Sequence, residues 1–117
     1  MCGIAGYFGE TKNPSECLAK MAQAINHRGP DSNGIWTDSE VIGLAHTRLS
    51  ILDLSDAGHQ PMHSVSGNYV LIFNGEIYNH QYLRSELESI SNRNWIGHSD
   101  TETLLASIEE WGIENTL

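Results

Sequence analysis

Segments with a helical spacing of apolar residues are grouped among short apolar runs in this sequence, and this grouping constrains the fold most strongly. The runs have the length of strands, and glycine, asparagine or aspartate lies beside them. They cover residues 2–8, 34–36, 41–46 and 69–73. Helices grouped among antiparallel hairpins are typical of an α+β domain whose helices cover the faces of a sheet. We therefore expect an α+β fold.

The first helix is expected to begin near Asn13 and Pro14, because an amide side chain can cap a helix and proline suits its first position. Glu16 adds a carboxylate to the first turn. Apolar residues then repeat at helical spacing, and they are Leu18, Met21, Ala22 and Ile25. The segment 27–31 contains Gly29 and Pro30 and is expected to end this helix.

Two more helices are expected in the second half of the chain. One covers residues 81–90 and has Leu83, Leu87 and Ile90 on one side. The other begins at Ser99, which forms a capping box with Glu102. Its core-facing residues are expected to be Leu104, Leu105, Ile108 and Trp111.

The connecting segments indicate how the strands are joined. Asp38 and Ser39 suit a turn between the runs 34–36 and 41–46, and residues 48–52 have the composition of a further strand. Residues 53–67 include Pro61, two glycines and many polar residues, which predicts a long loop. Only four or five strands are evident, so the sheet looks incomplete. We expect the chain to be part of a larger protein.

Composition excludes several classes of function. The chain has 117 residues, enough for one domain, and six basic residues against fifteen acidic ones give a net charge of -9. The basic residues form no stripe, so binding to nucleic acid or to an anionic membrane is not expected. No apolar run approaches the length of a membrane span. Two cysteines allow only one bridge, which fits a reducing, cytoplasmic location.

Cys2 follows the initiator methionine and is the candidate nucleophile. Removal of Met1 would leave a free α-amine beside the thiol, and an α-amine with a pKa near ~8 can accept the thiol proton and later return it to a leaving group. The alternative is a small buried side chain at the start of a strand, which suits most cysteines better. Cys17 lies beside Leu18 in the expected helix and is interpreted as a structural thiol.

Several blocks of sequence resemble class II glutamine amidotransferases, which are N-terminal nucleophile hydrolases, and in particular the glutaminase domain of asparagine synthetase. The blocks occur in one order and span nearly the whole chain, which makes chance agreement a poor explanation. They are Met1-Cys2-Gly3-Ile4-Ala5-Gly6, His27-Arg28-Gly29-Pro30-Asp31, Arg48-Leu49-Ser50-Ile51, Gly58-His59-Gln60-Pro61-Met62, Asn74-Gly75-Glu76-Ile77-Tyr78-Asn79 and Ser99-Asp100-Thr101-Glu102.

The resemblance implies an αββα sandwich of antiparallel sheets, of which residues 1–117 would be the N-terminal part. It implies attack by Cys2 on the side-chain amide of L-glutamine and release of ammonia to a synthetase domain that lies outside these residues. No cofactor is implied for the glutaminase half, whereas ATP and Mg²⁺ would belong to that synthetase domain. Asparagine formation is the default outcome, and a related amidotransferase acting on a sugar carboxylate is the alternative.

The resemblance also assigns roles to individual residues. The Asn74 side chain and the Gly75 backbone N–H would form the oxyanion hole, which must present donors where negative charge develops. Arg48 would bind the α-carboxylate of glutamine. The α-amine would be held by Glu76, Asp100 and the backbone of Leu49, Ser50, Ile51 and Leu52. Two alternatives stay open, because Asn-Gly is also a hairpin-turn signal and Asp100 suits any helix N-terminus.

Other classes of function stay open at this point. His59 and His63 have a spacing that zinc sites use, although neither cysteine forms a paired ligand motif. We therefore expect no metal site. A catalytically idle interaction module is a further alternative, although every reactive residue of the family pattern is present. The incomplete sheet would leave strand edges that favour pairing, so a homodimer is also an open alternative.

Overall fold

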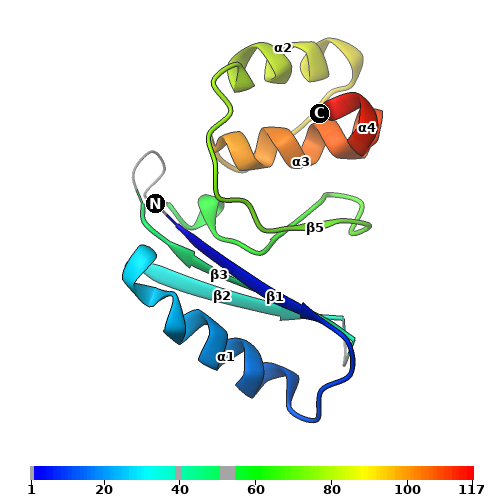
Figure 1. Ribbon diagram of the computed structural model, residues 1–117. Coiled ribbons are helices and arrows are strands. Elements are labelled where there is room, and N and C mark those ends of the chain that lie inside the picture. Colours follow the sequence, from blue (N-terminus) through cyan, green and yellow to red (C-terminus); the bar gives the residue numbers. More distant parts are fainter. Residues whose placement is uncertain (1, 39–40, 51–54) are drawn as a thin grey trace. The chain divides into compact units, whose positions relative to one another are not determined.

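The computed structural model describes residues 2–38, 41–50 and 55–117 (Figure 1). It is a mixed α+β structure with antiparallel sheets, as the sequence predicted. The chain forms two compact units. Unit 1 contains the described residues of Met1–Ile51 with His59–Pro61 and Ile72–Asn74, and unit 2 contains the described residues of Leu52–Gly58 with Met62–Leu71 and Gly75–Leu117. Each unit is described by itself below.

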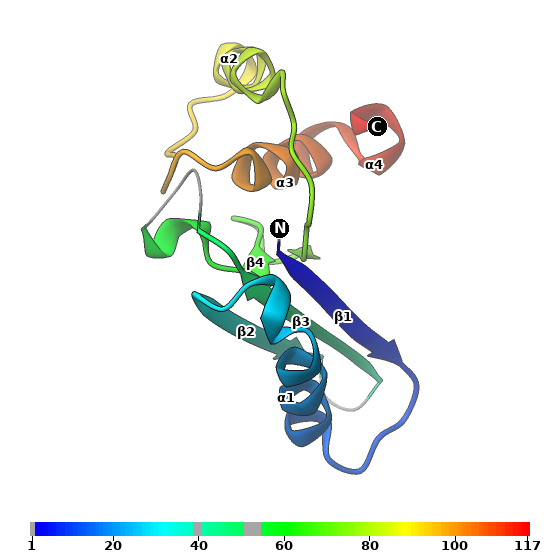
Figure 2. The ribbon, with the colours of Figure 1, turned by 60° about the vertical axis from the view of Figure 1, so that its left-hand side comes forward.

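Unit 1 is a three-stranded antiparallel sheet with one helix on a face. Its elements are β1 (Gly3–Phe8), α1 (Pro14–Ala24), the 3-10 turn η1 (Asn26–Arg28), β2 (Ser32–Thr37) and β3 (Ile42–Arg48). The strand order is β1-β3-β2, so β3 is the central strand. Helix α1 runs along one face of this sheet, as two views show (Figures 1 and 2).

The core of unit 1 lies between α1 and the sheet. Leu18 and Ala22 of α1 pack with Ala45 of β3, and Ala5, Tyr7 and Met21 surround them. Side chains alternate along a strand, so the residues next to these core positions lie on the opposite face of the sheet. On that face the register pairs His46 of β3 with Ile4 of β1 and with Gly34 of β2. This face carries Phe8, whose side chain is 84% exposed.

Unit 2 contains a short two-stranded sheet and three helices. Strands β4 (Met62–His63) and β5 (Val70–Leu71) are antiparallel, and the 3-10 turn η2 (Asp56–Gly58) precedes them. Helices α2 (His80–Ile90) and α3 (Asp100–Trp111) pack side by side, and α4 (Ile113–Thr116) follows after Gly112. No helix among the described residues is long and apolar enough to cross a bilayer.

The helices begin where the sequence predicted, but two side chains act differently. Asn13 precedes α1 without capping a backbone N–H, and its amide NH₂ instead donates to the Glu16 carboxylate at 3.4 Å. Ser99 does cap α3, accepting from Glu102 N–H at 3.2 Å. The Glu102 carboxylate does not complete the capping box. It instead accepts from the backbone N–H groups of Ile96 and Gly97.

The buried face of α2 also differs from the prediction. Leu87 is buried as expected, whereas Ile90 is 57% exposed. Arg84 is buried in its place and donates to Thr103, to the Gly97 carbonyl and to the Glu102 carboxylate. Its guanidinium also stacks on Trp95, 4.0 Å from the ring centroid. A periodicity argument missed this residue because it counts only apolar side chains. Helix α4 was not predicted.

Three expectations about strands and loops were wrong in extent. A strand was expected over residues 69–73, but β5 ends at Leu71. The N–H of Phe73 donates to the side chain of Gln60 and not to a neighbouring strand. Strand β3 ends at Arg48, and the expected strand 48–52 does not form at Leu49 and Ser50. The expected loop 53–67 contains η2 and β4. Ser39 of the expected turn lies outside the described residues.

Candidate active site

Cys2 lies just before β1, opposite the end of β3. The register pairs Gly3 with Thr47, so the next pair outward would be Cys2 and Arg48. The sulfur accepts a hydrogen bond from the backbone N–H of Leu49 at 3.4 Å and lies 3.8 Å from the Leu49 carbonyl oxygen. Cys2 is half-buried, and both cysteines are free thiols. The predicted nucleophile is therefore held against the chain segment that follows β3.

Arg28 fixes the backbone of the candidate nucleophile. Its Nε donates to the Cys2 carbonyl oxygen at 3.1 Å, across 26 residues of sequence. Arg28 is the last residue of η1 and is half-buried. A guanidinium on a backbone carbonyl makes a charge-assisted hydrogen bond, which is stronger than a neutral one. Arg28 therefore restrains the backbone just before β1, at the predicted nucleophile.

The remainder of the 27–31 segment packs around the end of β3. A Cβ on Gly29 would lie 2.5 Å from the carbonyl carbon of Thr47, so only glycine allows this close approach. The N–H of Asp31 donates to the Arg48 carbonyl at 3.0 Å. The Asp31 carboxylate in turn accepts the N–H of Ser50 at 2.7 Å. These contacts occupy backbone groups after β3 and explain why the strand stops at Arg48.

Asn74, the predicted oxyanion donor, belongs to unit 1 together with Cys2. It is exposed and follows Phe73, whose N–H donates to Gln60 Oε1 at 2.6 Å. The Gln60 side chain is 6% exposed, so this hydrogen bond is shielded from water. The Asn-Gly pair does not form the hairpin turn that was kept as an alternative, because the chain continues into α2 rather than a second strand.

The remaining described site residues lie in unit 2. Gly75 and Glu76 are exposed in the segment that leads to α2. Asp100 is the first residue of α3 and is half-buried. Its Oδ2 accepts the N–H of Ile77 at 2.9 Å, so unit 2 brings Asp100 close to the segment that carries Glu76. The same carboxylate lies at the N-terminus of α3, where the helix dipole favours negative charge.

The predicted residues thus fall into two sets. Unit 1 holds the described residues Cys2, Arg48, Leu49, Ser50 and Asn74, and unit 2 holds Gly75, Glu76 and Asp100. Ile51 and Leu52 lie outside the described residues.

The structure adds three residues that the sequence did not single out for a role. Arg28, Asp31 and Gln60 lie inside two of the quoted sequence blocks and contact Cys2, Ser50 and Phe73, respectively. The sequence blocks indicated that these three residues belong to the family pattern. They did not indicate which backbone groups the side chains contact.

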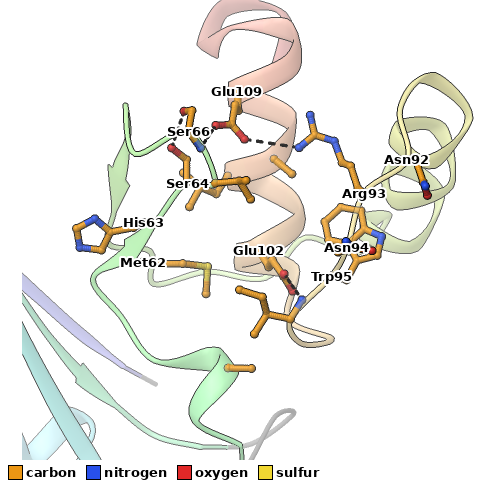
Figure 3. Close-up of a pocket in the computed structure, with 15 residues that line it drawn as sticks. Met62, His63, Ser64, Ser66, Asn92, Arg93, Asn94, Trp95, Glu102 and Glu109 are labelled. Carbon is orange, nitrogen blue, oxygen red and sulfur yellow. Dashed lines mark hydrogen bonds and ion pairs between the residues drawn. The ribbon is translucent and has the colours of Figure 1, made fainter.

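Unit 2 also contains a pocket of about 500 Å³ between the β4 region and α3 (Figure 3). At its edge Glu109 accepts the N–H of Ser66 at 2.8 Å and lies 3.6 Å from Arg93. The Ser66 hydrogen bond lowers the pKa of the Glu109 carboxyl against the opposing effect of desolvation. None of the described residues predicted to bind glutamine lines this pocket.

Histidines form no metal site in the part of the chain that the structure describes. No group of three His, Cys, Asp or Glu side chains there could hold a metal ion. His46 is buried on the central strand β3. Burial lowers its pKa from 6.5 to about 4, and electrostatic repulsion from the neighbouring His59 and Arg48 acts in the same direction, whereas a hydrogen-bonding interaction with the Phe73 backbone opposes them. His46 is therefore neutral near pH 7.

Comparison with known proteins gives a family for the whole chain. The model of the glutamine amidotransferase domain matches residues 1–117. A glutamine-hydrolysing asparagine synthetase of Bacillus subtilis is 42% identical over 95% of this chain and 18% of its own length. Asparagine synthetase B of Escherichia coli is 41% identical over 97% of the chain and 20% of its length. Amidase chry2 of Gibberella zeae is 34% identical over 97% of this chain and 18% of its own length.

The chain spans about a fifth of the length of each of these relatives. The family match extends from the first residue to the last, and so includes both sets of predicted site residues. Together with about 40% identity to glutamine-hydrolysing asparagine synthetases, it shows that this chain belongs to the class II glutamine amidotransferase domain family.

Proposed function

We propose that the chain hydrolyses the side-chain amide of glutamine, with Cys2 as the nucleophile once Met1 has been removed. The observation that carries this proposal is the placement of Cys2. Its sulfur accepts the Leu49 N–H and its carbonyl accepts the Arg28 guanidinium, so the residue is held at both ends. Membership in the family supports glutamine as the amide donor.

The proposed reaction begins with transfer of the Cys2 thiol proton to its own α-amine. The sulfur then attacks the amide carbon, and the Asn74 side chain and Gly75 N–H stabilise the resulting oxyanion. Collapse of this intermediate breaks the C–N bond, and the α-amine returns the proton to the departing ammonia. A thioester remains on Cys2, and water hydrolyses it to glutamate. This half of the reaction needs no cofactor.

Binding of the substrate is proposed to use the two ends of free glutamine. Arg48 would pair with the α-carboxylate, which a guanidinium can bind with two parallel hydrogen bonds. Glu76, Asp100 and the backbone of residues 49–52 would hold the α-amine. The contact between Asp100 and the Ile77 N–H supports this assignment, because it fixes the carboxylate beside the segment that carries Glu76.

The fold of the complete domain is proposed to be an αββα sandwich, of which this chain is the N-terminal part. The exposed Ile4 and Phe8 support this proposal, since they lie on the sheet face opposite α1. A second sheet packed on that face would bury both side chains, and burial of a large apolar side chain contributes roughly 2 kcal/mol.

For the whole protein we propose an amide synthesis in which ammonia passes to a synthetase domain that uses ATP and Mg²⁺. The identity to asparagine synthetases favours aspartate as the acceptor. The relatives named amidases favour a second candidate, in which the same glutaminase step serves another acceptor. The two are separated by supplying the full natural protein with glutamine, ATP and aspartate. Glutamate without asparagine would exclude the first.

The glutaminase proposal is tested with an electrophilic glutamine analogue, with adducts located by intact mass and peptide mapping. We expect one adduct, on Cys2 of chains that lack Met1, and we expect glutamine to compete with it. Cys17→Ser is the matched control and should label as the wild type does, whereas Cys2→Ser should not label. Labelling of Cys17, or no labelling of Cys2 once Met1 is gone, would overturn the proposal.

A further inference from the structure

The backbone of Phe73, the residue before Asn74, is held by two buried side chains of unit 1. Gln60 Oε1 accepts the Phe73 N–H at 2.6 Å. His46 of β3 also interacts with the Phe73 backbone, and this interaction raises the pKa of its imidazole against the larger opposing effect of burial. Gln60 is 6% exposed and His46 is 1% exposed. The Phe73 N–H therefore has a buried side-chain partner, and a second buried side chain interacts with the same backbone.

These two side chains are anchored to the sheet that also carries Cys2. His46 lies on the central strand, and the register places Gly34 of β2 directly beside it. A Cβ on Gly34 would lie 2.1 Å from the Gln60 carbonyl oxygen, so the backbone of Gln60 rests directly on the sheet at this glycine. Since β1 belongs to the same sheet, Cys2 and Gln60 are attached to one rigid element.

We propose that Gln60 is a positioning residue for the glutaminase reaction: by holding the Phe73 backbone, it aims the neighbouring Asn74 side chain at the oxyanion. This inference rests on the proposed function, in which Asn74 donates to the oxyanion. An oxyanion hole works because its donors are already oriented when charge develops. Strand β5 has ended at Leu71, so its ladder does not fix Phe73, and Gln60 performs this task instead.

The contact makes a specific kinetic prediction. A misplaced oxyanion donor weakens the transition state but leaves the bound glutamine largely unaffected, so kcat should fall while KM stays nearly constant. Gln60→Leu removes the acceptor oxygen at similar size. Loss of a complete donor reduces kcat by roughly 100- to 1,000-fold, so misplacement of Asn74 should cost roughly 10- to 100-fold. Gln60→Glu keeps an acceptor oxygen and should lose less.

The experiment uses the full natural chain and measures three quantities for each variant. They are kcat and KM for glutamine, the affinity for a glutamine-derived aldehyde that forms a tetrahedral adduct on Cys2, and the rate at which iodoacetamide alkylates Cys2. We expect Gln60→Leu to lower kcat and the aldehyde affinity by the same factor, with unchanged alkylation. Gln23→Leu, on the exposed surface of α1, is the matched control and should resemble the wild type.

A double-mutant cycle with Asn74→Ala tests the route of the effect. If Gln60 acts through Asn74, Gln60→Leu should not lower kcat further once Asn74 is alanine. Additive losses would overturn the inference, and so would a wild-type kcat in Gln60→Leu. Should that variant not fold, Gln60→Met, which matches the side chain in length, replaces it in the cycle. A wild type that neither hydrolyses glutamine nor labels at Cys2 would instead refute the proposed function.

Discussion

Protonation of His46 should destabilise unit 1 between about pH 6.5 and pH 4. Its pKa falls from 6.5 to about 4 in the folded chain, with burial as the largest cause. The groups that face it are Arg48 and His59, which disfavour the imidazolium electrostatically, and the Phe73 backbone, which favours it. Between the two pKa values the unfolded chain binds the additional proton. The free energy of unfolding therefore decreases as the pH falls through this window.

The magnitude follows from the size of the shift. One pKa unit corresponds to ~1.4 kcal/mol, so a shift from 6.5 to about 4 sets a ceiling of ~3 kcal/mol, reached below the folded pKa. Most of it, ~2.5 kcal/mol, should be lost between about pH 7 and about pH 4.5. The imidazole is buried, so solvent does little to screen this effect.

The assay is urea unfolding of the wild type and of His46→Gln at these two pH values. Carboxylates titrate in both proteins and cancel in the difference, whereas only the wild type carries the titrating imidazole. The stability of the wild type relative to the variant should therefore fall by ~2.5 kcal/mol at the lower pH. An NMR titration of the ring signals provides an independent value. A pH-independent difference, or a His46 ring that titrates near ~6.5, would refute the reasoning.

Urea unfolding of three further variants tests the packing within each unit. Leu18→Ala should lower the free energy of unfolding by ~3–5 kcal/mol, because Leu18 is fully buried against the sheet and its removal leaves a cavity. A loss below ~1 kcal/mol would mean that α1 does not pack as described. Arg84→Met should cost ~3 kcal/mol by leaving Glu102 without its cation, and a stabilised variant would contradict this. Ser99→Ala should cost ~1 kcal/mol by removing the cap of α3, whereas the exposed Ser85→Ala should cost much less, and equal costs would argue against the cap.

The sequence predicted most of the elements because their signals are local. Pro14 marks the start of α1, and Ser99 marks the start of α3. The apolar run that forms β1 is read from neighbouring residues alone. The extent of β5 was overestimated because Phe73 has the composition of a strand, and only the tertiary structure shows that its N–H is bound to Gln60. Strand pairing is a contact between distant residues, which local propensity does not encode.

The candidate site divides in the same way. The second position of Cys2 and the ordered sequence blocks predicted a nucleophile, a cation and carboxylates for glutamine. The family match confirms the domain family, and the residue roles stay predictions. The contacts that hold those residues depend on separations of 26 residues for Arg28 with Cys2 and 47 for Leu49 with Cys2. The same limit applies to Arg84, whose burial requires partners from α3.

The sequence by itself determined the family of this chain and the residues on which its proposed chemistry rests, since a thiol at position two and the order of the blocks are properties of the primary structure. The tertiary structure decided which side chains restrain that chemistry. It placed Arg28 on the Cys2 carbonyl, Asp31 on the Ser50 N–H and Gln60 on the Phe73 N–H. The physical reason is that a backbone group left without a strand partner must find another donor or acceptor when it is shielded from water, and only the folded chain determines which one is within reach.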